Sequence, residues 1–259
     1  MSEELQPAGG QAQPLIEHLL ELRRRLVWAV AGIAVCFFAI VPFAQTLYSF
    51  VAQPLMSVLP NNTSMIATDV IAPFFVPIKV ALMAAFLVAL PNTLYQIWAF
   101  VAPALYQNEK RLIVPLILSS IILFAAGMAF CYFLVFPMVF KFFAGMTPLG
   151  VSMATDIDKY LSFVLGMFVA FGLTFEIPVA VVLLYRMGVI TYRQLTAARP
   201  YLIVAAFIIA AVVTPPDVLS QIMLAVPMIL LYEIGILVCR IVKPRAVDGA
   251  DGDSEESQS

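Results

Sequence analysis

The sequence has few charged residues and no long polar domain. Only 12% of its 259 residues are Asp, Glu, Lys or Arg, whereas 63% are apolar, and the mean hydropathy is +0.99. Soluble globular domains contain about 25% charged and about 45–50% apolar residues. The composition therefore excludes an ordinary soluble domain and predicts an integral membrane protein.

Residues that bind metals or perform acid–base catalysis are also scarce. His18 is the only histidine, and Cys36, Cys131 and Cys239 lie far apart in apolar runs without a CxxC pair. We interpret the cysteines as small core residues and predict no metal site. The chain has neither a G-x-S-x-G elbow nor an H-E-x-x-H site, so we expect no enzyme activity, no cofactor and no nucleic-acid partner.

Long apolar runs occur six times. A hydrocarbon layer of about 30 Å requires about 20 helical residues, and the runs cover approximately 26–44, 74–100, 112–140, 160–185, 201–213 and 218–238. No stretch alternates like a barrel strand. The sequence predicts an all-α, polytopic membrane protein, with a flexible N-terminal tail at 1–13, a six-span bundle at 14–243 and a disordered tail at 244–259. The N-terminal segment lacks the basic region of a cleavable signal peptide, so we expect the first span to direct insertion.

The distribution of Lys and Arg predicts the orientation. Eleven of the fourteen lie near residue 24, near 110, between 186 and 199, or between 240 and 245. The connections at 45–72 and 144–158 alternate with these and hold turn-forming residues. Because cytoplasmic loops carry the excess of Lys and Arg, both termini and the two charged loops are predicted to be cytoplasmic.

Two features predict a curved bundle with an irregular end. Interior prolines break backbone hydrogen bonds and kink helices, and eight lie inside or beside the spans: Pro42, Pro73, Pro77, Pro91, Pro115, Pro137, Pro178 and Pro227. The fifth span, 201–213, is only about 20 Å long at 1.5 Å per residue. This span is shorter than the hydrocarbon layer, so its outer turn must be reached by water or by a locally thinned bilayer.

An amphipathic segment precedes the first span. Leu15, Leu19, Leu22 and Leu26 repeat at helical spacing, while Glu21 stands among three arginines. The functional hypothesis is that Glu21, with Glu109 in the loop near 101–111, offers carboxylates on a basic cytoplasmic face. A carboxylate can grip a guanidinium through two parallel hydrogen bonds. The alternative is a solvated helix face with i,i+4 ion pairs, and a loop in which Glu109 is incidental.

Polar residues within the later spans form a second group. Glu176 lies well inside the fourth span, where a charged residue normally faces a partner or a wet cavity. Thr214, Asp217 and Gln221 cluster at the turn between the fifth and sixth spans, where Asp217 is either functional or only a helix cap. We expect Glu176, Thr214 and Gln221 to contact a single-helix partner, since polar groups in hydrocarbon form hydrogen bonds with neighbouring helices.

Several motifs, in order along residues 14–245, resemble the TatC family of the twin-arginine translocase. They are HLLELRRRL at 18–26, MIATDV at 65–70, PFF at 73–75, YQIWAFVAPALY at 95–106, EKR at 109–111, DI at 156–157, FEIP at 175–178 and TPPD at 214–217.

The resemblance implies a six-helix, cupped bundle in the bacterial inner membrane. Members of this family bind twin-arginine signal peptides, associate with TatA- and TatB-type single-span subunits and with other copies of themselves, and export folded proteins with the proton-motive force. The resemblance also implies that Glu21 and Glu109 bind the signal peptide, with Arg23 and Phe100 in supporting roles. Structural candidates from the same resemblance are Pro54, Asp69 and Asp217.

The main alternative is a proton-coupled secondary transporter of a small solute, which an intramembrane carboxylate would suit. Such transporters often contain paired repeats with broken helices in corresponding places, and the sequence has no such repeat. An intramembrane enzyme is a weaker alternative, because Glu176 has no catalytic partner in the sequence.

Overall fold

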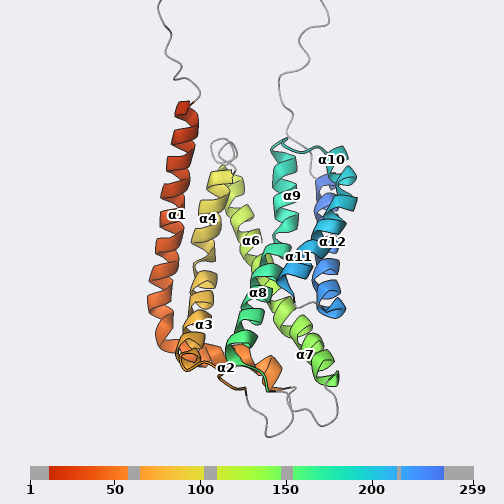
Figure 1. The fold of residues 1–259 in the computed structure, drawn as a ribbon. Helices are drawn as coiled ribbons and strands as arrows, with labels where there is room; N and C mark the ends of the chain where they lie inside the picture. Colours follow the sequence, from red (N-terminus) through yellow and green to blue (C-terminus); the bar gives the residue numbers. More distant parts are fainter. Residues whose placement is uncertain (1–11, 58–64, 102–109, 147–153, 215–216, 242–259) are drawn as a thin grey trace, which may run out of the picture. The chain divides into compact units, whose positions relative to one another are not determined.

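The structure, a computed structural model, describes residues 12–57, 65–101, 110–146, 154–214 and 217–241. The elements in chain order are α1 (Ala12–Ile40), η1 (Val41–Phe43), α2 (Ala44–Met56), α3 (Ala72–Val88), α4 (Leu90–Val101), α6 (Lys110–Phe130), η2 (Cys131–Val135), α7 (Phe136–Gly145), α8 (Ile157–Phe175), α9 (Ile177–Arg186), α10 (Tyr192–Ala197), α11 (Arg199–Val213) and α12 (Val218–Ile241) (Figure 1). Within these ranges the only β pairing is an isolated bridge between Ile66 and Asp156.

The helices confirm the predicted class. In the described ranges, four helical stretches are long and apolar enough to cross a membrane: Leu19–Met56, Val114–Gly145, Ile157–Arg186 and Val218–Ile241. The pair α3 and α4, bent by 59°, gives a fifth candidate span, and α11 is a shorter apolar helix of 15 residues. The chain is an all-α, polytopic membrane protein.

Helix α2 occupies the first part of the connection expected at 45–72. Gln45, Ser49 and Gln53 recur every four residues and are all exposed, whereas Ala44, Val51, Ala52 and Leu55 are buried. This is the pattern of an amphipathic helix. Its polar stripe interrupts the apolar run, and for this reason the sequence pattern predicts a connection here and not a helix.

The prolines mark helix breaks more often than they kink continuous helices. Pro77, Pro115 and Pro227 lie inside helices, but Pro42, Pro73, Pro137 and Pro178 occupy the first turn after a break. A first-turn proline loses nothing, because its missing N–H would have no partner in the helix. Between α6 and α7, five residues form the π-helical η2.

The chain divides into two compact units, residues 1–51 with 69–121 and residues 52–68 with 122–259. In the first unit, α1 packs against α3 and α4. Asn92 Nδ2 of α4 donates to the Trp28 carbonyl of α1 at 3.1 Å, and a Cβ on Gly32 would lie 2.4 Å from the same Nδ2 atom. Gly32 therefore lets the Asn92 side chain approach the α1 backbone closely.

In the second unit, α8 crosses the end of α6, and α9, α11 and α12 pack together (Figure 1). The α6–α8 crossing is close: a Cβ on Gly127 would lie 2.5 Å from the Phe171 carbonyl oxygen, and one on Gly172 would lie 2.4 Å from the Phe124 ring. The core between α9, α10 and α12 contains Val181, Tyr185, Leu195, Tyr232, Ile236 and Cys239.

Candidate functional site

The first candidate site lies on α1. Glu21 and Arg25 are one helical turn apart, and Arg25 Nε and Nη2 contact Glu21 Oε1 at 3.0 and 2.5 Å. The Glu21 side chain is 34% exposed and that of Arg25 is 19% exposed. Arg23 is exposed on another side of the helix. The ion pair on this turn thus uses Arg25, while Glu21 remains accessible.

Helix α4 brings Phe100 to the end of the same unit. Phe100 is half-buried one residue before α4 ends at Val101, and Glu109 lies outside the described residues. Trp98 Nε1 donates to Ser120 Oγ of α6 at 3.1 Å, with both side chains buried. This hydrogen bond fixes the end of α4 against α6.

Glu176 lies at a break in the fourth span. It ends α8 and precedes α9, its backbone N–H donates to Leu173 O at 3.1 Å, and its carbonyl accepts from Ala180 N at 2.9 Å. The residue is only 9% exposed. Because Pro178 follows in the first turn of α9, the helix restarts here with Glu176 at the junction.

The α11–α12 turn holds the other polar candidates. Thr214 is buried and donates from Oγ1 to Ala210 O at 2.8 Å, and Gln221 Nε2 donates to Phe207 O at 3.1 Å. Asp217 Oδ1 accepts from Ser220 N at 2.7 Å and therefore caps α12. Thr214 uses its hydroxyl hydrogen within the hairpin and Gln221 uses one of its two amide hydrogens, so both side-chain oxygens can accept from a partner and Gln221 can also donate to one.

The structure does not bring Glu176 together with Thr214 and Gln221. A Cβ on Gly235 of α12 would lie 3.2 Å from Pro178 Cα, so α9 begins beside Gly235. Gln221 precedes Gly235 on the same helix by 14 residues, or about 21 Å at 1.5 Å per residue. Glu176 and the polar residues of the α11–α12 turn therefore form two separate polar sites in the second unit.

Asp156 organises the loop that precedes α8. Its Oδ2 accepts from Thr68 N and Oγ1 at 3.0 and 2.5 Å, and its Oδ1 accepts from Asp158 N and Lys159 N, both at 3.0 Å. The Thr68 hydroxyl bond, followed by these backbone N–H bonds, lowers the pKa of the Asp156 carboxyl well below its ordinary value. In the sequence Asp156 stands out only as part of a short motif, because its partner Thr68 is 88 residues away.

The structural candidates Pro54 and Asp69 have local roles. Pro54 is buried within α2, and its carbonyl accepts from Ser57 Oγ at 2.9 Å. Asp69 Oδ1 accepts from Ile71 N at 3.3 Å just before α3.

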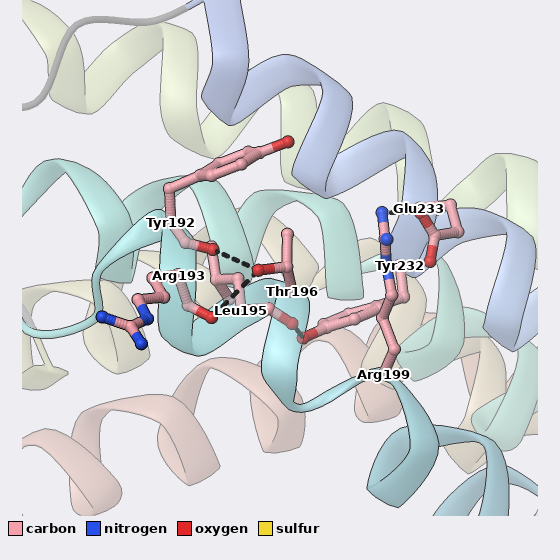
Figure 2. Close-up of polar contacts among 7 residues, drawn as sticks. All are labelled: Tyr192, Arg193, Leu195, Thr196, Arg199, Tyr232 and Glu233. Atoms are coloured by element: carbon pink, nitrogen blue, oxygen red, sulfur yellow. Dashed lines mark hydrogen bonds and ion pairs between the residues drawn. The ribbon is translucent and has the colours of Figure 1, made fainter.

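A further polar cluster, which sequence reasoning missed, joins α10, α11 and α12 (Figure 2). Tyr232 Oη donates to the Leu195 carbonyl at 2.9 Å, and Arg199 Nη2 contacts Glu233 Oε2 at 2.8 Å. Arg199 and Glu233 side chains are 45% and 38% exposed. Glu233, an acidic residue within the apolar run of α12, is the sequence feature that could have indicated this cluster.

Comparisons with known proteins agree with this architecture. The TatC family (Sec-independent protein translocase protein) matches residues 17–227. The TatC proteins of Haemophilus influenzae and Escherichia coli are each 51% identical, over 96% and 88% of this chain and 97% and 88% of their own lengths. A crystal structure of the twin arginine translocase receptor TatC is 40% identical, with a TM-score of 0.77 over 86% of this chain and 98% of that one. This chain belongs to the TatC family.

Proposed function

We propose that the chain is the core subunit of the twin-arginine translocation system. In this role it binds twin-arginine signal peptides of folded cargo at its cytoplasmic face and organises partner subunits for export driven by the proton-motive force. Family membership supports the translocase role. The observation that carries the site is an accessible Glu21 carboxylate on an arginine-rich turn of α1.

The orientation follows from charge. The ends of α1, α9 and α12 that carry Arg23, Arg186 and Arg240 belong to the Lys- and Arg-rich set of segments. Under the positive-inside rule this set faces the cytoplasm, with both termini. Signal peptides reach the protein from that side.

Glu21 and Glu109 recognise the two arginines of the signal peptide. A basic face repels a cationic peptide, so local carboxylates must supply the attraction. A guanidinium can form two parallel hydrogen bonds with a carboxylate, whereas lysine is a compact, hydrated charge. Twin arginines are therefore preferred to twin lysines, with Arg23 and Phe100 shaping the surrounding surface.

Binding of a labelled signal peptide to the purified protein tests this assignment. Glu21→Ala and Glu109→Ala should each weaken binding, and Glu21→Lys and Glu109→Lys should weaken it more because they add repulsion. Asp158→Asn, at the start of α8, is the matched control and should bind normally. Equal affinity for twin-arginine and twin-lysine peptides, or unchanged binding by the double lysine variant, would refute the site.

Three polar residues of the second unit contact the single helices of TatA- and TatB-type subunits: Glu176, Thr214 and Gln221. Interhelical hydrogen bonds in membranes contribute about 0.6–2 kcal/mol each, so Glu176→Gln, Thr214→Val and Gln221→Leu should weaken association without abolishing it. Cysteine at Val212, an 81% exposed position of α11, should cross-link to a partner helix, whereas cysteine at Phe38, 75% exposed on α1, serves as the lipid-facing control. No cross-link at Val212 in either resting or cargo-bound complexes would argue against this contact.

A further inference from the structure

The start of α12 contains two buried polar atoms that no other described group satisfies. Ser220 is fully buried, and its Oγ has no hydrogen-bond partner among the described residues. The same holds for Asp217 Oδ2, although Oδ1 of that carboxylate caps the helix at 2.7 Å from Ser220 N. An unsatisfied hydroxyl and an unsatisfied carboxylate oxygen therefore occupy one helical turn.

The local sequence explains why the neighbouring residues do not supply the missing donor. Pro215 and Pro216 directly precede Asp217, and proline has no backbone N–H. Thr214, the nearest hydroxyl before them, already donates its hydrogen to Ala210 O. Burying a carboxylate oxygen without a donor is more costly than burying a neutral group, so this turn requires a donor that the described residues do not supply.

We propose that the α11–α12 turn binds one internal water molecule, which bridges Asp217 Oδ2 and Ser220 Oγ. The water donates one hydrogen to the carboxylate oxygen and accepts the Ser220 hydroxyl hydrogen. Because Ser220 N lies 2.7 Å from Oδ1, the two side chains are in the same turn, and they form no direct hydrogen bond with each other. Buried polar groups that form no direct hydrogen bond with each other are typically joined by buried water.

The bound water gives Asp217 a second function beside helix capping. One carboxylate oxygen holds the α12 backbone, and the other holds the water that satisfies Ser220. The site lies at the start of α12, between Thr214 and Gln221 in the chain. This inference concerns the isolated chain and does not depend on the proposed binding of cargo or partners.

Thermal unfolding of the detergent-purified protein distinguishes a water site from an orphaned hydroxyl. If Ser220 Oγ holds the water, Ser220→Ala removes a water ligand and leaves Asp217 Oδ2 without a donor, so Tm should fall by about 2–6 °C. If the hydroxyl is simply unsatisfied, its removal should raise Tm. Ser119→Ala is the matched control, because that hydroxyl donates to Leu116 O within its own helix. A rise, or a change no larger than in the control, would overturn the proposal.

Nuclear magnetic resonance of serine-labelled protein tests the water directly. A resident water beside the Asp217 carboxylate should give a cross-relaxation peak between the water resonance and the Ser220 amide, which itself donates to Asp217 Oδ1. The Ser119 amide, in the middle of α6, should give none. Absence of the Ser220 peak in the wild type would also overturn the proposal.

Discussion

Arg25 contacts Glu21 through two nitrogen atoms that both approach the same carboxylate oxygen, Nε at 3.0 Å and Nη2 at 2.5 Å. The contact holds the Glu21 side chain along α1 while leaving it one-third exposed. In the proposed function, a signal-peptide arginine therefore meets a carboxylate that is already oriented and partly neutralised. An i,i+4 ion pair on a helix contributes only about 0.2–0.5 kcal/mol, so Arg25 can share or release the carboxylate at little cost.

This relationship predicts unequal effects of neutralising the two residues. Arg25→Gln removes a weak competitor and should change signal-peptide affinity by no more than about twofold. Glu21→Gln removes a charge-assisted pair, which contributes about 1.5–3 kcal/mol when sheltered and less than 1 kcal/mol when exposed, and should cost more. Fluorescence anisotropy with a labelled peptide measures both. A larger loss in Arg25→Gln than in Glu21→Gln would mean that Arg25 supports the site itself.

Much of the fold follows from the apolar runs in the sequence and from the charged and turn-forming residues that separate them. The six runs coincide with α1, the α3–α4 pair, α6 to α7, α8 to α9, α11 and α12. Kinks are expected at Pro137 and Pro178, and these prolines lie in the first turns of α7 and α9, where the helical hydrogen-bond pattern is interrupted. Helix α2 was missed, since its polar stripe and short length do not resemble a membrane span.

The site was less predictable because contacts between distant segments decide it. The Thr68–Asp156 and Arg199–Glu233 contacts join residues 88 and 34 positions apart, and one sequence gives no signal for such pairing. The same reason separates Glu176 from Gln221: both are polar residues of late spans, but the packing of Pro178 against Gly235 places them at different levels of the bundle. The Glu21–Arg25 pair, by contrast, follows from helical spacing alone.

Asp156 makes stability depend on acid pH. Its pKa is lowered in the folded protein, so its stabilising effect is complete above its unfolded pKa of about 3.9 and is lost as the pH falls below that value. Asp156→Asn should lower Tm at pH 7, because an amide cannot accept all the hydrogen bonds that the carboxylate accepts from Thr68, Asp158 and Lys159. It should also flatten the fall in Tm below about pH 4. Parallel pH curves for the variant and the wild type would show that another group dominates acid unfolding.

The α6–α8 crossing should not tolerate a methyl group. Gly172→Ala would place Cβ 2.4 Å from the buried Phe124 ring, and Gly127→Ala would place it 2.5 Å from the Phe171 carbonyl oxygen. Overpacking of this kind costs about 1–3 kcal/mol, with the larger effect expected at Gly127, where the opposing atom is backbone. Gly166→Ala, also in α8, meets nothing within 4 Å and should raise Tm, because alanine favours a helix by up to about 1 kcal/mol. A lower Tm in Gly166→Ala than in Gly172→Ala would contradict the packing argument.

The final prediction concerns the attachment of α10, a helix of six residues. Tyr232 is 5% exposed, and its hydroxyl satisfies the Leu195 carbonyl at 2.9 Å (Figure 2). Tyr232→Phe removes this buried hydrogen bond and leaves the Leu195 carbonyl with the longer bond from Ala198 N at 3.2 Å, which costs about 0.5–1.5 kcal/mol. The Arg199–Glu233 pair is exposed and contributes less than about 1 kcal/mol. Tyr232→Phe should therefore destabilise the protein more than Glu233→Gln.

Hydrogen exchange locates the effect. In Tyr232→Phe, amides of α10 should exchange faster while those of α4, in the other unit, stay protected, because only the α10–α12 contact is lost. Tyr201→Phe is the matched control: Tyr201 is 78% exposed at the start of α11, so removing its hydroxyl should leave exchange unchanged. Uniform acceleration across both units would indicate global destabilisation. In that case Tyr232 would support the whole second unit, and the specific attachment of α10 would be wrong.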